Sequence, residues 1–197
     1  EYTTTLRYVR RWREANRSGS DGYGELVWAP GVAQIDFGVA KARIVGELVD
    51  DHRLVVTFPH SNMRYVTSLP GENAECLCHG LVEVFEHIGG VPPVIVMDNA
   101  TGAGRRNARG EVTPAAVLDV FDIKKSLSHK GNPYDNAVVE STNRPLKKEL
   151  VYRNHYTTIE QLRHDLNDYV WWSDNRRLHS TLGYRSPKEF TEQGLVL

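Results

Sequence analysis

The sequence is poor in the features that mark secreted, disulfide-stabilised and membrane-spanning proteins. Only two of its 197 residues are cysteine, Cys76 and Cys78, so the sequence indicates no disulfide framework. This low cysteine content fits a reducing cytoplasm. It contains no run of 18 or more apolar residues, so we expect no membrane-spanning segment. The chain begins at Glu1 without a charged-then-apolar signal region, which favours a cytoplasmic location and a piece of a longer protein.

The charge balance also lacks the basic excess that is typical of DNA-binding proteins, because the formal net charge is −1. The charges are unevenly distributed, however. Residues 1–17 contain five Arg against two acids, and residues 98–155 contain ten Lys and Arg against seven acids, whereas residues 29–97 contain four against eight. The basic excess therefore lies in two segments, although composition alone does not indicate DNA binding.

The composition, 40% hydrophobic and 9% aromatic, fits a globular domain with a short extension. Residues 2–16 have helical spacing, and the Gly- and Ser-rich residues 17–24 are typical of a linker. We therefore divide the chain into an N-terminal helix and linker, residues 1–28, and a core with a C-terminal helix, residues 29–197. The N-terminal helix resembles the last helix of a helix-turn-helix DNA reader, and we interpret it as a remnant of one or as a linker helix.

The core is predicted to be a mixed β-sheet with helices on both faces. Alternating apolar residues predict a three-stranded antiparallel meander, with a turn at Asp50-Asp51-His52, and a fully apolar run predicts a buried strand that ends before Asp98. The strands are expected at 32–38, 42–49, 53–59, 94–97 and 122–128. The helices are expected at 72–88, 113–121, 135–152 and 158–173, the last opened by a capping box of Thr157 and Glu160. Pro145 should kink or break the third helix.

Three acidic residues occupy positions that are hard to explain structurally. Asp36 lies inside the first strand, Asp98 follows an apolar strand at the end where α/β sheets place ligands, and Glu140 lies in an apolar stretch of a helix. Each has a plain alternative, since an Asp in a strand is often an edge or turn residue and a Glu on a helix is often solvated. Spacing alone therefore leaves the choice open.

Together, the three carboxylates would need cations. At about 4 Å, each pair repels by on the order of 4 kcal/mol at an effective dielectric near 20. Hard oxygen ligands select Mg²⁺ or Mn²⁺, and two such ions support phosphodiester chemistry by activating the attacking oxygen and stabilising the leaving one.

Two stretches carry a family resemblance. The segment Lys130-Gly-Asn-Pro-Tyr-Asp-Asn-Ala-Val-Val-Glu140-Ser resembles the signature around the third catalytic acid in one large family of insertion-sequence transposases, as does His179-Ser-Thr-Leu-Gly-Tyr-Arg-Ser-Pro187. The segments around Asp36-Phe-Gly and Asp98-Asn99 are similar to a second transposase family, whose enzyme works with a separate AAA+ helper ATPase. The resemblance covers residues from Ala29 to about Phe190, and because it is mixed it leaves the helper partner open.

The resemblance implies a ribonuclease H-like fold and the catalytic core of a bacterial DNA transposase, acting on DNA at the nucleoid. It implies hydrolysis at the transposon ends, then attack of the freed 3′-hydroxyls on target DNA by multimers assembled on DNA. It also implies that Asp36 bridges two Mg²⁺ ions, while Asp98 and Glu140 each complete the coordination of one.

Several residues near the acids are candidates for DNA contacts. On an unbroken helix, Arg144 and Lys147 would share the face of Glu140, with Lys148 at its flank; a solvated basic face is the alternative. Arg105 and Arg106 lie on a loop beside Asp98 and would bind backbone phosphates; a disordered loop is the alternative. Asn99 would orient a metal-bound water or cap the turn. Lys130 belongs to the signature itself.

Three other interpretations compete with a transposase core. Cys76, Cys78 and His79 suggest zinc, but one helix cannot arrange them tetrahedrally and the sequence has no second pair of ligands. A ribonuclease H-like nuclease would hydrolyse DNA without joining it. A non-catalytic DNA-binding or assembly module would be favoured by a missing acid, and all three acids are present.

Overall fold

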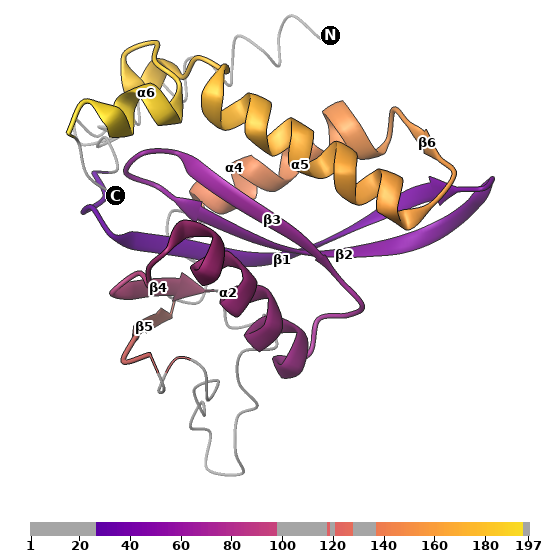
Figure 1. Cartoon of the computed structure of the whole chain (residues 1–197), viewed down its shortest axis with the longest axis horizontal. Coiled ribbons are helices and arrows are strands. Elements are labelled where there is room, and N and C mark those ends of the chain that lie inside the picture. Colours follow the sequence, from indigo (N-terminus) through magenta and orange to yellow (C-terminus); the bar gives the residue numbers. More distant parts are fainter. Residues whose placement is uncertain (1–26, 98–117, 119–120, 128–136, 195–197) are drawn as a thin grey trace, which may run out of the picture.

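The computed structural model describes residues 27–97, 118, 121–127 and 137–194. At its centre is a mixed sheet with the strand order β3-β2-β1-β4-β5, to which a short strand, β6, adds at the far end of β1 (Figure 1). Strands β1 to β3 are antiparallel neighbours, whereas β4 and β5 run parallel to β1. The strands are β1 (Val32–Ile44), β2 (Glu47–Phe58), β3 (Met63–Leu69), β4 (Val94–Met97), β5 (Lys124–Leu127) and β6 (His155–Tyr156). The mixed five-stranded sheet is confirmed.

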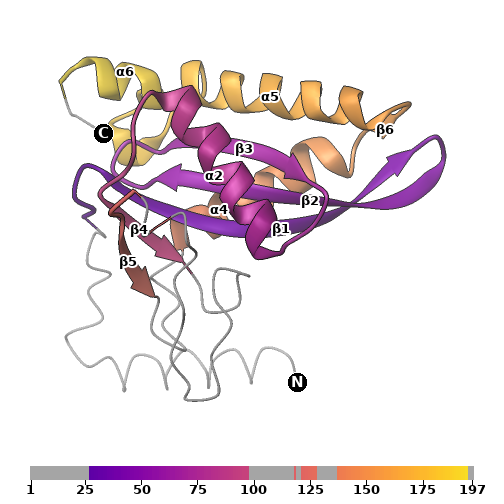
Figure 2. The same cartoon turned by 60° about the horizontal axis from the view of Figure 1, so that its bottom comes forward.

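Helices cover both faces of this sheet, as the sequence predicts. Helix α2 (Ala74–Ile88) crosses one face. Helices α4 (Ala137–Pro145), η1 (Leu146–Val151) and α5 (Ile159–Asn175) cover the other, so that α2 lies in front of the sheet and α4 behind it in Figure 2. Two short elements, η2 (Ser180–Leu182) and α6 (Pro187–Glu192), follow α5. None of the helices in these described ranges is long and apolar enough to cross a membrane.

Strand β1 serves both faces because successive side chains of a strand point to opposite sides. Ala33 and Ile35 are completely buried in the apolar cluster under α2, whereas Ala40 and Ala42 belong to the cluster under α4 and α5. The same division continues on β2, where residues 54, 56 and 58 face α2 and residue 55 faces α4. Gln34, Asp36 and Gly38, which alternate with the α2-facing residues, therefore belong to the face that α4 covers.

Helix α2 forms as its sequence predicts. Asn73 caps its first turn by accepting a hydrogen bond from the backbone N–H of Cys76 at 2.8 Å. Gly89 ends it in the left-handed conformation, with φ of 68°. Leu77 and Leu81 are completely buried, and burial of each stabilises the fold by about 1.5–3 kcal/mol.

The predicted meander is wrong in its boundaries. The chain reverses at Val45 and Gly46, both with positive φ, and the residues predicted as a turn lie inside β2. Asp51 is 2% exposed and pairs with Arg53, which is completely buried, at 3.0 Å between Oδ2 and Nε. Burial raises the pKa of Asp51 and lowers that of Arg53, so each charge depends on the other for its stability. Charged residues that resemble a turn in the sequence are here an ion pair within the sheet.

The start of α5 also differs from the prediction. Thr158 rather than Thr157 is the N-cap, and its side chain accepts a hydrogen bond from the N–H of Gln161. The side chain of Gln161 in turn accepts a hydrogen bond from the backbone N–H of Thr157 at 2.8 Å. The helix therefore opens with Thr158 and Gln161, each one residue after the predicted Thr157 and Glu160. Leu162 and Leu166 pack on the core as expected, with Tyr169 at its edge.

Candidate active site

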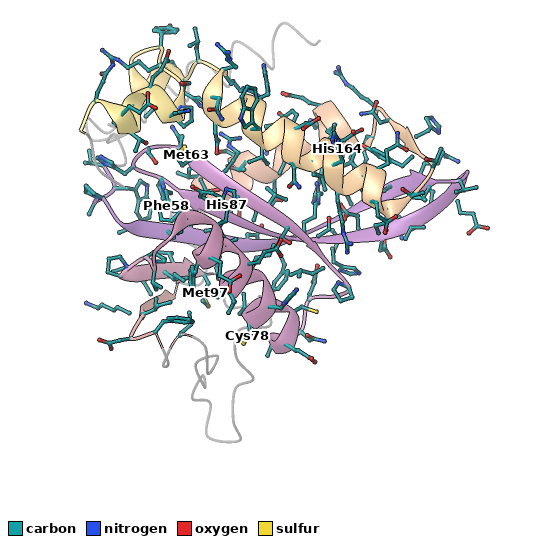
Figure 3. All side chains as sticks on the ribbon, in the orientation of Figure 1. Phe58, Met63, Cys78, His87, Met97 and His164 are labelled. Carbon is teal, nitrogen blue, oxygen red and sulfur yellow. The ribbon has the colours of Figure 1, made fainter. Side chains whose placement is uncertain are left out.

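The structure places two of the three predicted acids on the same side of the sheet. Asp36 lies half-buried in the middle of β1. This strand lies between β2 and β4 in the sheet. Glu140 is exposed on the first turn of α4, the helix that covers this face. Met97, labelled in Figure 3, is the last residue of β4 and is in register with Ile35. Strand β4 therefore ends beside Asp36. Asp98 is the next residue in the chain and lies outside the described residues.

Polar contacts, rather than apolar packing alone, fix α4 on the sheet. The side-chain oxygen of Gln34, a completely buried residue, accepts a hydrogen bond from the backbone N–H of Val139 at 3.1 Å. This N–H lies in the first turn of the helix, where backbone donors have no partner within the helix. One turn later, Thr57 on β2 donates to the hydroxyl of Thr142 at 3.3 Å. The two contacts lie on either side of Glu140 in the sequence and so fix the turn that carries it.

A third contact reaches Asp36 itself. Asn143 donates from Nδ2 to Oδ2 of Asp36 at 2.8 Å. Since Asn143 follows Glu140 by three residues, the two side chains lie on neighbouring positions of one helix face. The hydrogen bond therefore holds Asn143 against the strand bearing Asp36, and Glu140 is exposed one turn earlier on the same helix.

Pro145 changes the winding of this helix without ending it. α4 continues directly into a π-helix, η1, across Leu146–Val151, as expected where a backbone donor is missing. The 3.6-residue periodicity that would bring Lys147 to the face of Glu140 therefore does not hold beyond Pro145. Arg144 and Lys148 are exposed, whereas Lys147 is half-buried.

A polar cluster joins η1 to α5. Glu149 accepts hydrogen bonds from the hydroxyl of Tyr169 at 2.6 Å and from Arg177 at 3.0 Å. The Tyr169 hydrogen bond and the guanidinium hold the pKa of Glu149 below its usual range. The guanidinium also lies over the ring of Trp172, 5.5 Å from its centroid, although both Trp171 and Trp172 are largely exposed. This cluster connects the π-helix to the longest helix of the fold.

The sequence predicts more of the site than the described residues contain. Asp98, Asn99, Arg105, Arg106 and Lys130 all lie outside them, as does most of the expected helix 113–121. Within the described ranges no three His, Cys, Asp or Glu side chains form a group that could hold a metal. Asp36 and Glu140 contribute carboxylate oxygens, which are the ligands that Mg²⁺ and Mn²⁺ prefer, so the donor chemistry fits these ions.

The zinc interpretation gains no support from the described part of the chain. Cys76 is buried in the apolar cluster under α2, and Cys78 is a partly buried neighbour of that cluster. Figure 3 places Cys78 on α2 and His164 on α5, which lie on opposite sides of the sheet. Neither cysteine is part of a metal-binding group among the described residues.

Sequence reasoning missed Gln34, Gly38 and Asn143. A signal for Gln34 is present, because a polar residue two positions from Asp36 lies on the same face of the strand. Asn143 has no such local signal, since its partner lies 107 residues away in the sequence.

Comparison with known proteins finds two kinds of sequence similarity. Residues 121–187, about a third of the chain, match the integrase core domain family. The chain is 41% identical over 99 residues to the transposase for insertion sequence element IS904 of Lactococcus lactis subsp. lactis (strain IL1403), covering 50% of this chain and 38% of the relative. Over about half of its length this chain is similar to an insertion-sequence transposase. It is also 35% identical over 77 residues to the putative transposase InsK for IS150 of Escherichia coli (strain K12), covering 39% of this chain and 27% of the relative. It thus spans well under half of either relative.

Solved structures establish the fold. The catalytic core domain of BIV integrase superimposes with a TM-score of 0.59 at 17% identity, covering 84% of this chain and 96% of that one. A chain of the simian T-cell lymphotropic virus intasome in complex with PP2A regulatory subunit B56 gamma gives a TM-score of 0.61 at 18% identity, covering 84% and 55%. The sheet and its covering helices therefore have the ribonuclease H-like fold of integrase catalytic cores.

Proposed function

We propose that this chain is the catalytic core of a DNA transposase, which cleaves transposon ends and joins the freed 3′-hydroxyls to target DNA. The observation that carries the proposal is the hydrogen bond between Asn143 and Asp36, which joins the helix carrying Glu140 to the acid of β1. The similarity to insertion-sequence transposases and the integrase-like fold support the same reaction.

In this proposal Asp98 is the third acid. It follows Met97, whose strand pairs with β1 beside Asp36. The three carboxylates would together hold two Mg²⁺ or Mn²⁺ ions. When bound, such ions activate the attacking oxygen and stabilise the leaving one. Asp36 is braced by Asn143, and Glu140 is carried on a helix turn fixed from both sides, so both acids are held in place before substrate binds.

The basic residues beside the site would bind DNA. Arg144 and Lys148 are exposed on the helix that carries Glu140, and we assign them to backbone phosphates, which add affinity without sequence preference. Lys147, half-buried, would contribute less. Asn99, Lys130, Arg105 and Arg106 are assigned to the same surface from sequence alone.

The proposal also covers the domain division of the chain, its assembly on DNA and its partners. We assign residues 29–197 to the catalytic core and residues 1–28 to a connecting helix and linker. The enzyme would act as a multimer on DNA at the nucleoid of a bacterial cytoplasm. The front-half resemblance supports an AAA+ ATPase as an additional partner, and its addition should then raise strand transfer.

The test is an assay of the purified chain on supercoiled plasmid with Mg²⁺ or Mn²⁺, scored separately for nicking and for joining of a labelled oligonucleotide. Asp36→Asn, Asp98→Asn and Glu140→Gln should each abolish both products while the thermal midpoint changes little. Asp168→Asn, which alters an exposed acid on α5, is the matched control and should retain both.

The other outcomes identify the alternatives. Nicking without joining would replace the transposase with a ribonuclease H-like nuclease. DNA binding without either product would indicate a non-catalytic module, and unchanged cleavage by Asp98→Asn would overturn the three-acid site.

A further inference from the structure

The amide of Asn143 is held in a nearly closed space against β1. Only 7% of the residue is exposed, and its Nδ2 lies 2.8 Å from Oδ2 of Asp36. A carboxylate only accepts hydrogen bonds, so the amide must present its NH₂ group to Asp36 and turn its oxygen the other way. Its Oδ1 has no hydrogen-bond partner among the described residues. One orientation of this side chain is therefore selected by Asp36.

Gly38 makes room for that orientation. It lies two residues after Asp36, on the same face of β1. A Cβ atom at Gly38 would lie 2.6 Å from Oδ1, 3.1 Å from Cγ and 3.3 Å from Nδ2 of Asn143, and its three nearest neighbours all belong to that one side chain. The backbone of Gly38 is ordinary strand, without a positive φ, so glycine is needed here for space rather than for conformation.

We propose that Gly38 and Asn143 are a matched pair of positioning residues, which together orient the carboxylate of Asp36 for metal binding. The inference rests on the proposed function, in which Asp36 is a metal ligand. Asn143 holds Oδ2 and so fixes the rotation of the carboxylate group. Gly38 acts through Asn143, by leaving free the volume that the amide must occupy to reach Asp36.

The pair also connects the two acids on the described elements. Asn143 lies one helical turn after Glu140, so the hydrogen bond that orients Asp36 also sets the position of the helix face bearing Glu140. Attachment of α4 to the sheet does not depend on this bond alone, because Gln34 and Thr57 already hold the helix. Loss of the Asn143 contact should therefore disturb the site more than it disturbs the fold.

A larger residue at Gly38 should act in a specific way. The clash would be with the end of a flexible side chain rather than with backbone, so Asn143 can relieve it by rotating away from Asp36. Gly38→Ala should therefore leave the protein folded but break the hydrogen bond, and it should mimic Asn143→Ala although it alters neither partner. In the absence of the Asn143 side chain, the added methyl group has nothing to displace.

The experiment compares the parent chain with Gly38→Ala, Asn143→Ala and the double variant. Ser141→Ala is the matched control, since Ser141 is exposed on the same helix and its hydroxyl donates to the carbonyl of Val138 at 2.7 Å. In the metal-free protein, NMR of the Asn143 side-chain amide reports the hydrogen bond directly. In the parent and in Ser141→Ala the resonance should shift when Asp36→Asn is introduced. In Gly38→Ala it should not.

The second measurement is Mn²⁺ affinity, determined by electron paramagnetic resonance, with the thermal midpoint recorded alongside. Removal of a residue that orients a metal ligand weakens metal binding about 10- to 100-fold, so we expect at least a tenfold weaker Kd in each single variant. The double variant should be no weaker than Asn143→Ala alone. A merely structural role would lower the thermal midpoint and leave the Mn²⁺ affinity of the folded protein unchanged.

Failure of this inference differs from failure of the proposed function. If the parent binds Mn²⁺ and joins DNA while both single variants stay within twofold of its affinity, the positioning pair is wrong and the transposase stands. Additive losses in the double variant would also overturn the pair. A parent that neither binds Mn²⁺ nor joins DNA would overturn the proposed function, and this inference with it.

Discussion

The two faces of the sheet hold their helices by different means. On the α2 face the buried contacts are apolar, from Leu77 and Leu81 against the side chains of β1 and β2, and the hydrogen bond from Thr67 to Glu83 lies at the exposed edge. On the α4 face an apolar cluster is supplemented by three hydrogen bonds between sheet and helix: Gln34 and Asp36 accept from Val139 and Asn143, and Thr57 donates to Thr142. Apolar burial is non-directional, whereas hydrogen bonds are sensitive to distance and angle. The face that stabilises the fold is therefore built differently from the face that sets the position of the candidate active site.

The largest stability effect should come from the α2 face. Leu81→Ala removes a completely buried side chain and should lower the free energy of unfolding by about 2–5 kcal/mol, measured by urea denaturation. Strand transfer per folded molecule should be unchanged, since α2 carries none of the three candidate catalytic acids. A fall in activity beyond the loss of folded protein would show that the two faces are not separate.

A smaller loss of stability, with a clear loss of activity, should come from the α4 face. Gln34→Leu keeps the size of a buried side chain but leaves the N–H of Val139 without this acceptor, at a cost of about 1–3 kcal/mol. Because the turn bearing Glu140 is then less well fixed, strand transfer per folded molecule should also fall. Thr57→Val removes the hydroxyl that donates to Thr142, in a hydrogen bond between two neutral groups. It is the control and should lower both the free energy of unfolding and strand transfer by less.

The buried pair of Arg64 and Asp174 should give the α4 face a pH dependence. Burial raises the pKa of Asp174 to about 7 despite the hydrogen bond and charge of Arg64, so this residue makes the fold less stable as it ionises with rising pH. Burial and Arg64 lower the pKa of His179 to about 4, which has the opposite effect, with an unfavourable contribution that fades as pH rises past the ordinary histidine pKa. Between pH 6.5 and 8 the Asp174 contribution should fall by about 0.8 kcal/mol and His179 should offset about half of this, so the parent should lose about 0.4 kcal/mol of stability.

Asp174→Asn tests this assignment, since asparagine does not titrate. Urea denaturation at the two pH values should show no loss of stability with rising pH for the variant, although the variant is less stable at both because Arg64 loses its charged partner. Equal slopes in parent and variant would assign the pH dependence elsewhere.

Among the substitutions, the smallest effect should come from the exposed cluster that joins η1 to α5. Tyr169→Phe removes the hydroxyl that donates to Glu149 and should cost about 0.5–1 kcal/mol, because Arg177 still holds the carboxylate. The denaturation midpoint is the measurement. A loss as large as that of Gln34→Leu would mean that this cluster, rather than the contacts with β1, positions α4.

Local patterns predicted those parts of the fold that local chemistry determines. The apolar run of β4 and the Gly89 terminus of α2 are short-range effects, and each was found where the sequence places it. Pro145 was expected to kink or break its helix, which instead continues as a π-helix. The strand boundaries around Asp51 were not predictable in this way. In the sequence Asp51 resembles a turn residue. Its role in the sheet becomes visible only when the fold brings its partners, Arg53 and Ser68, beside it.

The same limit applies to the site. Asp36 and Glu140 stand out in the sequence as candidates because acids in apolar strands and helices are unusual, and the family resemblance supports them. Asn143 and Gly38 are ordinary residues in ordinary places, and their relation exists only after α4 packs on β1. No periodicity encodes a contact between residues that far apart.

Strand β1 constrains how the sequence can change. Its odd-numbered residues from Ala33 to Phe37 face α2, and its even-numbered residues from Gln34 to Ala42 face α4. Substitutions can be absorbed one position at a time, but inserting or deleting one residue between Ala33 and Gly38 would exchange the two sets. Homologous chains should therefore differ in residue type along this strand while keeping its residue count, with length variation confined to the Val45–Gly46 turn and beyond.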